Sequence, residues 1–229
     1  MGRRDKNIAK NEIYGAFRTF IQSGTSKATI SSIVESTGLN RKTFYNHFSS
    51  RDELAAWGFR RDLLDELLSQ YEREELEDPP SDLYGFEGLP CYVRTPSGPL
   101  SLDQSNYISC FCGVFRTYRA YYASLLRTEF ASPFCRYLVG LFQGLFYEDL
   151  DYFLNGRKMP DEAKRYIAAF FAEGVVHHTV DSMADGSISR REVGDMPPVN
   201  NLVHNAMYQL VEAYQNEKSN MYFNKFRSL

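Results

Sequence analysis

The chain has 229 residues, of which 43% are hydrophobic and 24% charged, and a formal net charge of −3. This composition supports a large buried core and excludes a chain that is disordered throughout. No run of about 18 apolar residues is present, so no membrane-spanning helix is expected. No apolar stretch follows the charged N-terminus, so no signal peptide is expected either, and we predict a cytoplasmic protein.

Positive charge is concentrated in the first quarter of the chain. Residues 1–61 hold 11 Lys and Arg against 5 Asp and Glu, a net charge of +6. Residues 62–229 hold 15 against 24, a net charge of −9. A basic end on an acidic body indicates that only the N-terminal part meets a polyanion.

Two helices are predicted first along the chain. Apolar residues recur at steps of three and four over residues 5–22, as on one face of an amphipathic helix. Thr29 is a suitable N-cap for a short second helix, because its hydroxyl can accept a hydrogen bond from the first turn. Gly38 is expected to stop that helix.

Two more helices follow without a long connection. Asn40 can cap a third helix that runs from Arg41 to about His47. Asp52 and Glu53 suit the positive end of a fourth helix, which is expected to continue to the acidic tract at 72–78.

The remainder of the chain is also predicted to be helical. Prolines and glycines make residues 79–102 a long loop, which is either functional or mobile. Ser101 is expected to cap the helix that follows. Helices are predicted at about 103–118, 119–130, 133–153, 161–183 and 199–216, with a loop at 185–198 and a tail at 217–229. No segment longer than four residues alternates as a strand does, so the fold class is all-α.

The stretch TISSIVESTGLNRKTFYNHFSSRDEL, residues 29–54, predicts a helix-turn-helix. Two short helices meet at a turn formed by Gly38 and Leu39, and in this layout the second helix enters the DNA major groove. Apolar residues on the inner faces can form a small core: Phe17, Phe20, Ile33, Val34, Leu39, Phe44 and Phe48. The outer face of the third helix carries hydrogen-bond donors.

Residues 8–61 resemble the DNA-binding domain of the TetR/AcrR family of bacterial repressors. The resemblance rests on Thr29, Ile33, Gly38, Thr43-Phe44-Tyr45, His47-Phe48 and Arg51-Asp52-Glu53-Leu54. It implies an N-terminal three-helix DNA-binding domain at 1–51 and a larger helical domain at 52–229. That second domain would bind a small ligand and dimerise through its last two long helices, at about 161–183 and 199–216.

The resemblance also implies a set of DNA-binding residues. Thr29 would contact a phosphate and Ser31 a base or a phosphate. The early third helix would face base edges with Arg41, Lys42 and Thr43, since Arg and Lys suit the acceptors of guanine. Tyr45, His47 and Arg51 would contact the DNA backbone, and Asn46 lies where the family varies. Tyr45 and His47 could instead be packing residues, and Ser49-Ser50 replaces a more usual basic or polar pair, so one phosphate contact is expected to be lost.

An effector pocket would lie between the helices of residues 103–183. The candidate lining residues are Tyr107, Phe111, Phe115, Tyr118, Tyr122, Phe142, Phe146, Phe170 and His177. Such a pocket would suit a planar or apolar ligand. The same aromatic spacing also fits a plain core.

No catalytic or metal-binding motif is found in the sequence. The four cysteines match no zinc spacing, and we expect them to be reduced core residues. His177 and His178 are adjacent, so they cannot face one site on a helix, and no third ligand clusters with them and Asp181. We therefore expect no enzyme activity, no metal and no cofactor.

These features predict a ligand-responsive homodimeric repressor of transcription that binds an inverted-repeat operator in double-stranded DNA. A small apolar or aromatic effector would change the angle between the fourth helix and the bundle, and so alter the spacing of the two DNA-binding heads. The alternative is a DNA-bound interaction protein, with a coactivator or chromosome-organising role. In that case the second domain binds a protein partner, with the 79–102 loop as the contact.

Overall fold

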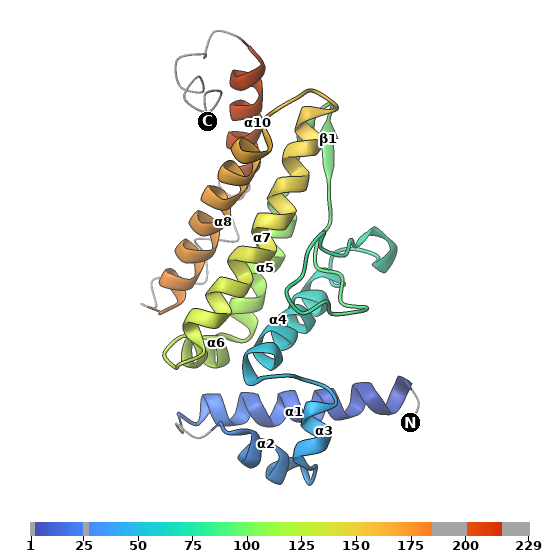
Figure 1. Ribbon diagram of the computed structural model, residues 1–229, viewed down its shortest axis with the longest axis vertical. Coiled ribbons are helices and arrows are strands. Elements are labelled where there is room, and N and C mark those ends of the chain that lie inside the picture. Colours follow the sequence, from blue (N-terminus) through green and yellow to red (C-terminus); the bar gives the residue numbers. More distant parts are fainter. Residues whose placement is uncertain (1–2, 25–27, 185–200, 217–229) are drawn as a thin grey trace.

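The computed structural model describes residues 3–24, 28–184 and 201–216. The predicted loop at 185–198 and the predicted tail at 217–229 lie outside these residues. Three helices form a head at one end of the molecule, namely α1 (Arg3–Gln22), α2 (Ile30–Thr37) and α3 (Arg41–Tyr45) (Figure 1). All three match the predicted helices, although α3 ends two residues earlier than expected.

The helix α4 (Arg51–Leu67) leaves the head and enters the body (Figure 1). Asp52 and Glu53 occupy its first turn as predicted, and the Ser50 hydroxyl caps it by accepting a hydrogen bond from the Glu53 N–H. The helix ends at Leu67, before the acidic tract, and the next residue, Leu68, is 41% exposed. A single 3-10 turn, η1 (Arg73–Glu75), lies within the tract instead.

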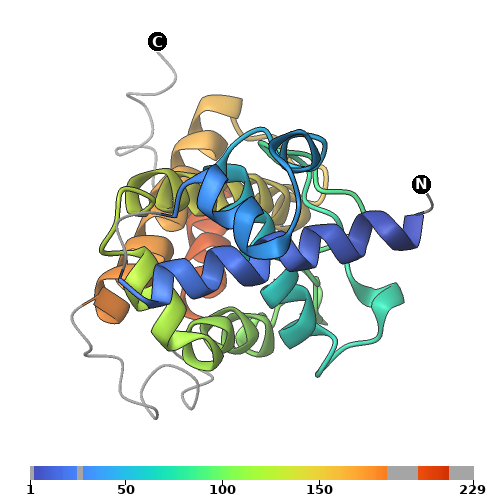
Figure 2. The same cartoon turned by 90° about the horizontal axis from the view of Figure 1, so that it is seen from below.

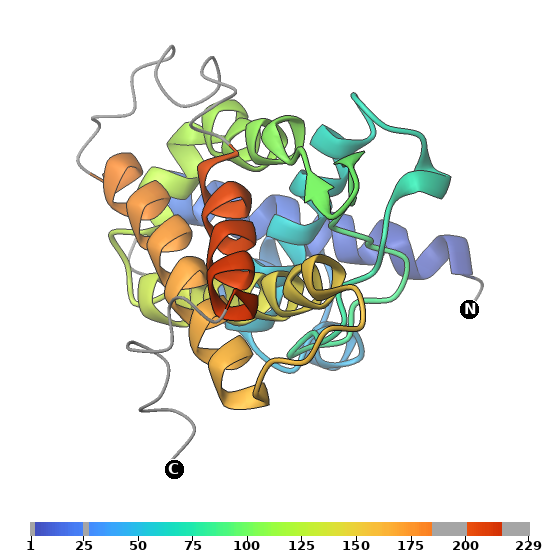
Figure 3. The ribbon, with the colours of Figure 1, turned by 90° about the horizontal axis from the view of Figure 1, so that it is seen from above.

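The body contains α5 (Ser105–Thr117), α6 (Arg119–Leu125), α7 (Ala131–Leu154), α8 (Asp161–Ala184) and α10 (Leu202–Gln215). The long helices α7 and α8 pack along each other, and α10 lies beside them at the end far from the head (Figures 1 and 3). The helix α5 begins at Ser105, whose N–H donates a hydrogen bond to the Asp103 carboxylate at 3.0 Å. The prediction that Ser101 caps this helix is therefore wrong. The helix α6 is also shorter than expected. None of the described helices is long and apolar enough to cross a bilayer.

Part of the 79–102 loop is built into the core, and part of it is exposed. Cys91 and Tyr92 are fully buried, and Leu102 is 1% exposed. The loop also holds a small antiparallel hairpin of β1 (Pro96–Gly98) and β2 (Ser101–Leu102). The buried apolar side chains of the loop thus serve as core residues, and the described part of the fold is all-α apart from this hairpin.

One buried polar cluster ties the loop to two helices. The Tyr92 hydroxyl donates a hydrogen bond to the Asp149 carboxylate on α7. Nε2 of His204 on α10 lies 3.1 Å from the same carboxylate, and Nε of Arg94 donates to its other oxygen at 3.1 Å. The Asp149 and His204 side chains are completely buried. A carboxylate removed from water in this way is stable only while its partners surround it.

We predict that Asp149→Ala lowers the free energy of unfolding by about 3 kcal/mol or more, because Tyr92, Arg94 and His204 lose their common partner. Asp151→Ala on the same helix is the matched control. Its carboxylate pairs with Lys164 but is 52% exposed, so its loss should cost less than about 1 kcal/mol. Urea unfolding of both variants checks this, and equal costs would contradict it.

Candidate nucleic-acid interface

Two side-chain caps and one left-handed glycine define the ends of α2 and the start of α3. The Thr29 hydroxyl accepts a hydrogen bond from the Ser32 N–H at 3.2 Å and caps α2. Gly38 has φ of 68°, a left-handed conformation that glycine adopts without strain, and it ends that helix. The Asn40 side chain accepts from the Thr43 N–H at 2.8 Å and caps α3. These are the caps and the turn that the sequence predicted.

An apolar core beneath the turn holds the two helices together. Phe17, Ile33 and Phe44 are fully buried, and Phe48 is 1% exposed. The ring of Phe48 lies 5.9 Å from that of Phe44 and 5.6 Å from that of Trp57 on α4. Both phenylalanines of α3 and its following turn are therefore core residues, as predicted, and the opposite side of the helix is left for solvent.

The head presents its polar face away from the body. Figure 2 looks onto the head from below and shows α1, α2 and α3 in front of the body helices. Five of the predicted DNA-binding residues are exposed, namely Thr29, Arg41, Lys42, Tyr45 and Asn46. Ser31, Thr43 and His47 are half-buried. The structure thus gathers eight of the nine predicted residues on α2, α3 and their flanking turns.

Tyr45 is a surface residue and not a core residue. Its side chain is 57% exposed, and only the edge of its ring meets Phe44, at 5.6 Å between centroids. A large aromatic side chain that is exposed beside two cations is unusual on a solvated helix, and it leaves the phenol free to reach a binding partner.

Arg41 and Ser31 are joined across the two helices. Nε of Arg41 donates to the Ser31 hydroxyl at 3.1 Å, and Nη2 donates to the same oxygen. This contact uses one edge of the guanidinium plane. The opposite edge keeps its donors in the fork geometry that suits bidentate recognition.

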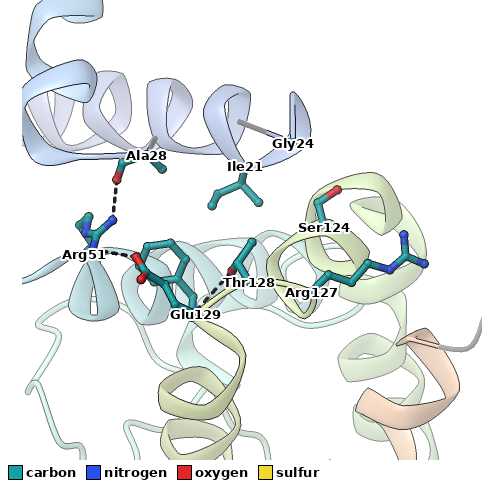
Figure 4. Close-up of a pocket in the computed structure, with 9 residues that line it drawn as sticks. Ile21, Gly24, Ala28, Arg51, Ser124, Arg127, Thr128 and Glu129 are labelled. Carbon is teal, nitrogen blue, oxygen red and sulfur yellow. Dashed lines mark hydrogen bonds and ion pairs between the residues drawn. The ribbon is translucent and has the colours of Figure 1, made fainter. Parts of the chain in front are cut away.

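Arg51 makes contacts within the protein. Its guanidinium donates to the Ala28 carbonyl at 2.9 Å and pairs with Glu129 of the body at 2.9 Å. It also stacks on the Phe130 ring, 4.9 Å from the centroid. In this structure Arg51 therefore joins the head to the body at the junction, apart from the α2–α3 surface (Figure 4).

A buried carboxylate forms a second contact between head and body. Asp62 on α4 is 2% exposed. It accepts hydrogen bonds of 2.8 Å from the hydroxyls of Tyr14 on α1 and Tyr122 on α6. Burial raises the pKa of this carboxyl from 3.8 to about 6, and the two tyrosine hydrogen bonds oppose the increase.

The same junction depends on a glycine and an arginine that the sequence did not single out. A Cβ atom built on Gly58 would lie 2.1 Å from Cε2 of Tyr14, so only glycine lets the ring cross α4 here. The Arg18 guanidinium lies 3.9 Å from Asp62 and 4.4 Å from the Tyr118 ring centroid. Both residues occur in helical stretches without a motif, and the sequence carries no local signal for a contact 44 or more positions away.

Seven of the nine predicted effector-binding residues lie inside the body. Six of them are fully buried, with 0% exposure: Tyr107, Phe111, Phe115, Tyr122, Phe142 and Phe146. Their rings form one continuous chain of contacts, with centroids 4.8–6.3 Å apart. Tyr118 is half-buried at the junction. This packing is that of a core.

The other two residues lie on the outside of α8. Phe170 is 63% exposed, and His177 is also exposed. Neither shares a cavity with the six buried rings. These two candidates therefore lie apart from the six buried rings, because the helical spacing of α8 turns their positions outward. No cluster of metal ligands occurs among the described residues.

The geometry defines a helix-turn-helix DNA-binding domain, and comparisons with known proteins agree. Residues 13–56 match the profile of the bacterial regulatory proteins of the tetR family. The resemblance to the tetR family is thus found over residues 13–56, which include α2 and α3.

Two individual proteins are similar to the chain. It is 31% identical over 81 residues to the HTH-type dhaKLM operon transcriptional activator DhaS of Lactococcus lactis subsp. lactis (strain IL1403). The match spans 35% of this chain and 38% of that relative's length. A solved structure of the dihydroxyacetone kinase operon activator DhaS aligns over 90% of this chain and 97% of its own, with a TM-score of 0.49 and 17% identity.

We predict that Asp62 makes the protein less stable as the pH rises. Its folded-state pKa lies above its unfolded value, so its contribution is largest in acid and is lost as the pH passes through about 6. Between pH 5 and pH 8 this loss amounts to roughly 1–1.5 kcal/mol.

The measurement is the thermal or urea stability of wild type and Asp62→Asn at several pH values. The variant should lack this component of the pH dependence. Asp65→Asn, on the same helix with a side chain that is 53% exposed, serves as the control. A pH profile of Asp62→Asn that is parallel to that of wild type would show that another group titrates.

Proposed function

We propose that this chain is a transcriptional regulator that binds double-stranded DNA through α3. The observation that carries the proposal is the composition of the α2–α3 surface. A tightly packed helix-turn-helix core leaves Arg41, Lys42 and Tyr45 exposed to solvent, and α2 and α3 lie at the end of the molecule away from the body (Figure 1). The basic charge of the head and the tetR family profile over residues 13–56 support the same function.

Each residue of the surface takes a role that suits its chemistry. Arg41 and Lys42 would read base edges in the major groove, with guanine as the preferred base, and Thr43 and Asn46 would lie beside them. Ser31 would hold the Arg41 guanidinium in register for that contact. Thr29, Tyr45 and His47 would contact phosphates, which position the helix without reading sequence.

The protein would act as a homodimer through α8 and α10. Tyr166 and Phe170 on α8 are each 63% exposed, and Leu202 on α10 is 61% exposed. Large apolar side chains on two helices at the end far from the head are typical of an interface. A two-fold axis there would place two recognition helices about 34–36 Å apart, on successive major grooves of an inverted repeat.

Repression is the proposed outcome of operator binding, because a dimer on an operator can exclude other proteins without making any further contact. The Lactococcus relative is named a transcriptional activator. A reporter gene behind the selected operator measures directly whether the protein represses or activates transcription. The DNA-binding mechanism is the same for a repressor and an activator. A small effector would act by preferring one spacing of the heads over the other.

A second candidate function is supported by the body. Six of the expected pocket residues fill the core, and Leu83 on the 79–102 loop is 77% exposed. The loop is anchored beside it, since Asp82 pairs with the buried Arg60 at 2.6 Å. A fixed loop with an exposed leucine would suit a protein partner better than a small molecule, and the protein would then be a DNA-bound interaction protein.

We predict that Arg41→Ala weakens binding to the operator by about 1–3 kcal/mol and relaxes the preference at one base position. Ser31→Ala should relax the same position to a smaller extent, since Arg41 remains. Site selection from a random DNA pool, followed by fluorescence anisotropy at several salt concentrations, checks both. Arg61→Ala is the control, because this cation lies on α4 away from the α2–α3 surface.

Two results would contradict this assignment. Salt-sensitive binding without any enriched sequence would indicate non-specific contact with phosphates alone. If Arg41→Ala keeps the base preference of the wild type at the enriched site, a residue other than Arg41 reads that base.

We predict that Phe170→Glu converts a dimer into monomers, because a carboxylate would be buried against the apolar face of α8. Sedimentation equilibrium over a range of concentrations measures the change. Leu83→Glu carries the same substitution at another exposed apolar site and should remain dimeric. A Phe170→Glu protein that still dimerises would exclude this face as the interface.

A further inference from the structure

An open groove runs along the outer face of α7. Its volume is about 480 Å³, within the range of small-molecule sites. Pro80 and Ser81 of the 79–102 loop, residues 140–151 of α7 and Arg165 of α8 contribute to its lining. The groove therefore lies apart from the α2–α3 surface and from the buried aromatic rings of the body.

Two glycines of α7 leave room for the groove. A Cβ atom built on Gly144 would lie 2.9 Å from Oγ of Ser81, so glycine lets the loop come close to the helix. A Cβ atom built on Gly140 would meet no atom within 4 Å, so this position faces open space. Both glycines line the groove, and a larger side chain at Gly140 would fill part of it.

The charged residues of the lining are already paired within the protein. Nη2 of Arg94 lies 3.5 Å from the Glu148 carboxylate, and Nζ of Lys164 lies 2.8 Å from the Asp151 carboxylate. Nε of Arg165 lies 2.6 Å from a carboxylate one turn earlier on α8. An ionic ligand would have to compete with one of these internal partners, so the lining does not favour a charged molecule.

Several hydrogen-bonding groups of the lining have no partner in the protein. The Ser81 hydroxyl and the Gln143 amide make no hydrogen bond with another described residue. Asp151 uses only Oδ1 for Lys164, so its Oδ2 can accept a further hydrogen bond. A ligand hydroxyl can donate to a carboxylate or accept from an amide, so a molecule with many hydroxyls can use these groups together.

We infer that this groove binds a neutral, hydroxyl-rich small molecule of the size of a monosaccharide or a disaccharide. Ser81, Gln143 and Asp151 would make its hydrogen bonds, and Pro80 would contact its carbon atoms. The groove is open, and each hydroxyl exchanges water for the protein at a small net gain, so we expect an affinity on the order of millimolar.

The groove is connected to α4, the helix that leaves the head. Ser81 precedes Asp82, whose carboxylate pairs with the buried Arg60 of α4 at 2.6 Å. A ligand that contacts Ser81 in one arrangement of the loop favours that arrangement, and with it one position of Asp82. We therefore expect the ligand to change the affinity for DNA. This part of the inference rests on the proposed function, whereas binding in the groove does not require DNA.

The probes are three neutral saccharides, namely D-glucose, D-galactose and sucrose. D-glucosamine and D-gluconate are added as the positively and negatively charged counterparts of glucose. Binding to the full chain is measured by saturation-transfer difference NMR, which detects weak affinities. At least one saccharide should bind saturably and more tightly than either charged compound, because the ions of the lining are already paired.

Two variants locate the binding site. Gly140→Leu should weaken binding of the saccharide at least tenfold, because the new side chain fills the groove, and leucine is a better helix former than glycine. Gln143→Ala should weaken it about threefold through the loss of a hydrogen bond. Gly15→Leu is the control for the first variant, since this exposed glycine of α1 also has no atom within 4 Å of its Cβ position. It should leave the affinity unchanged.

Three results would overturn the assignment. The first is the absence of saturable binding for all three saccharides at high millimolar concentrations. The second is tighter binding of D-glucosamine or D-gluconate than of any saccharide, since this would show a site for an ion. The third is unchanged affinity in both Gly140→Leu and Gln143→Ala, which would place the saccharide outside the groove. Melting temperatures confirm that all variants are folded.

A second arm measures the affinity for the operator with and without the saccharide that binds most tightly. This affinity should change by at least about threefold in wild type and not in Gly140→Leu. Saccharide binding without any effect on a confirmed operator would refute the control of DNA binding by the groove. Failure to find an operator would instead refute the proposed function and leave the NMR result standing.

Discussion

The place of the DNA-binding head depends on the buried carboxylate of Asp62. It accepts a hydrogen bond from one tyrosine of the head and one of the body, so a single group on α4 joins α1 to α6. A carboxylate removed from water must keep such partners, and this requirement holds the three helices at fixed positions. Gly58 makes the arrangement possible, because any side chain there would collide with Tyr14.

The junction has a rigid side and an open side. Around Asp62 the contacts are buried and aromatic, with the Arg18 guanidinium against tyrosine rings. Around Arg51 they are half-exposed, with a cleft beside them. The two sides of the junction therefore differ in burial and in access to solvent.

Most aromatic side chains of the body pack against one another in the core and do not line a cavity. The rings from Tyr107 to Phe146 fill the space between α5, α6 and α7, and Tyr92 of the loop enters the same core. The buried cluster around Asp149 then attaches α10, the last described helix, to α7. Phe170 on α8 is 63% exposed, and its ring meets that of Phe171, which packs against the core.

The sequence alone determined what depends on neighbouring residues. The helix caps at Thr29 and Asn40, the turn at Gly38 and the inward positions of Phe44 and Phe48 follow from local hydrogen bonds and helical spacing, and all were predicted correctly. Only the tertiary structure decided what depends on distant residues: the burial of Cys91 and Tyr92, the outward position of Phe170, the ion pair of Arg51 with Glu129 and the junction at Asp62. Periodicity shows that a helix has an apolar face but not which element covers it, because that choice is made by packing between segments far apart in the chain.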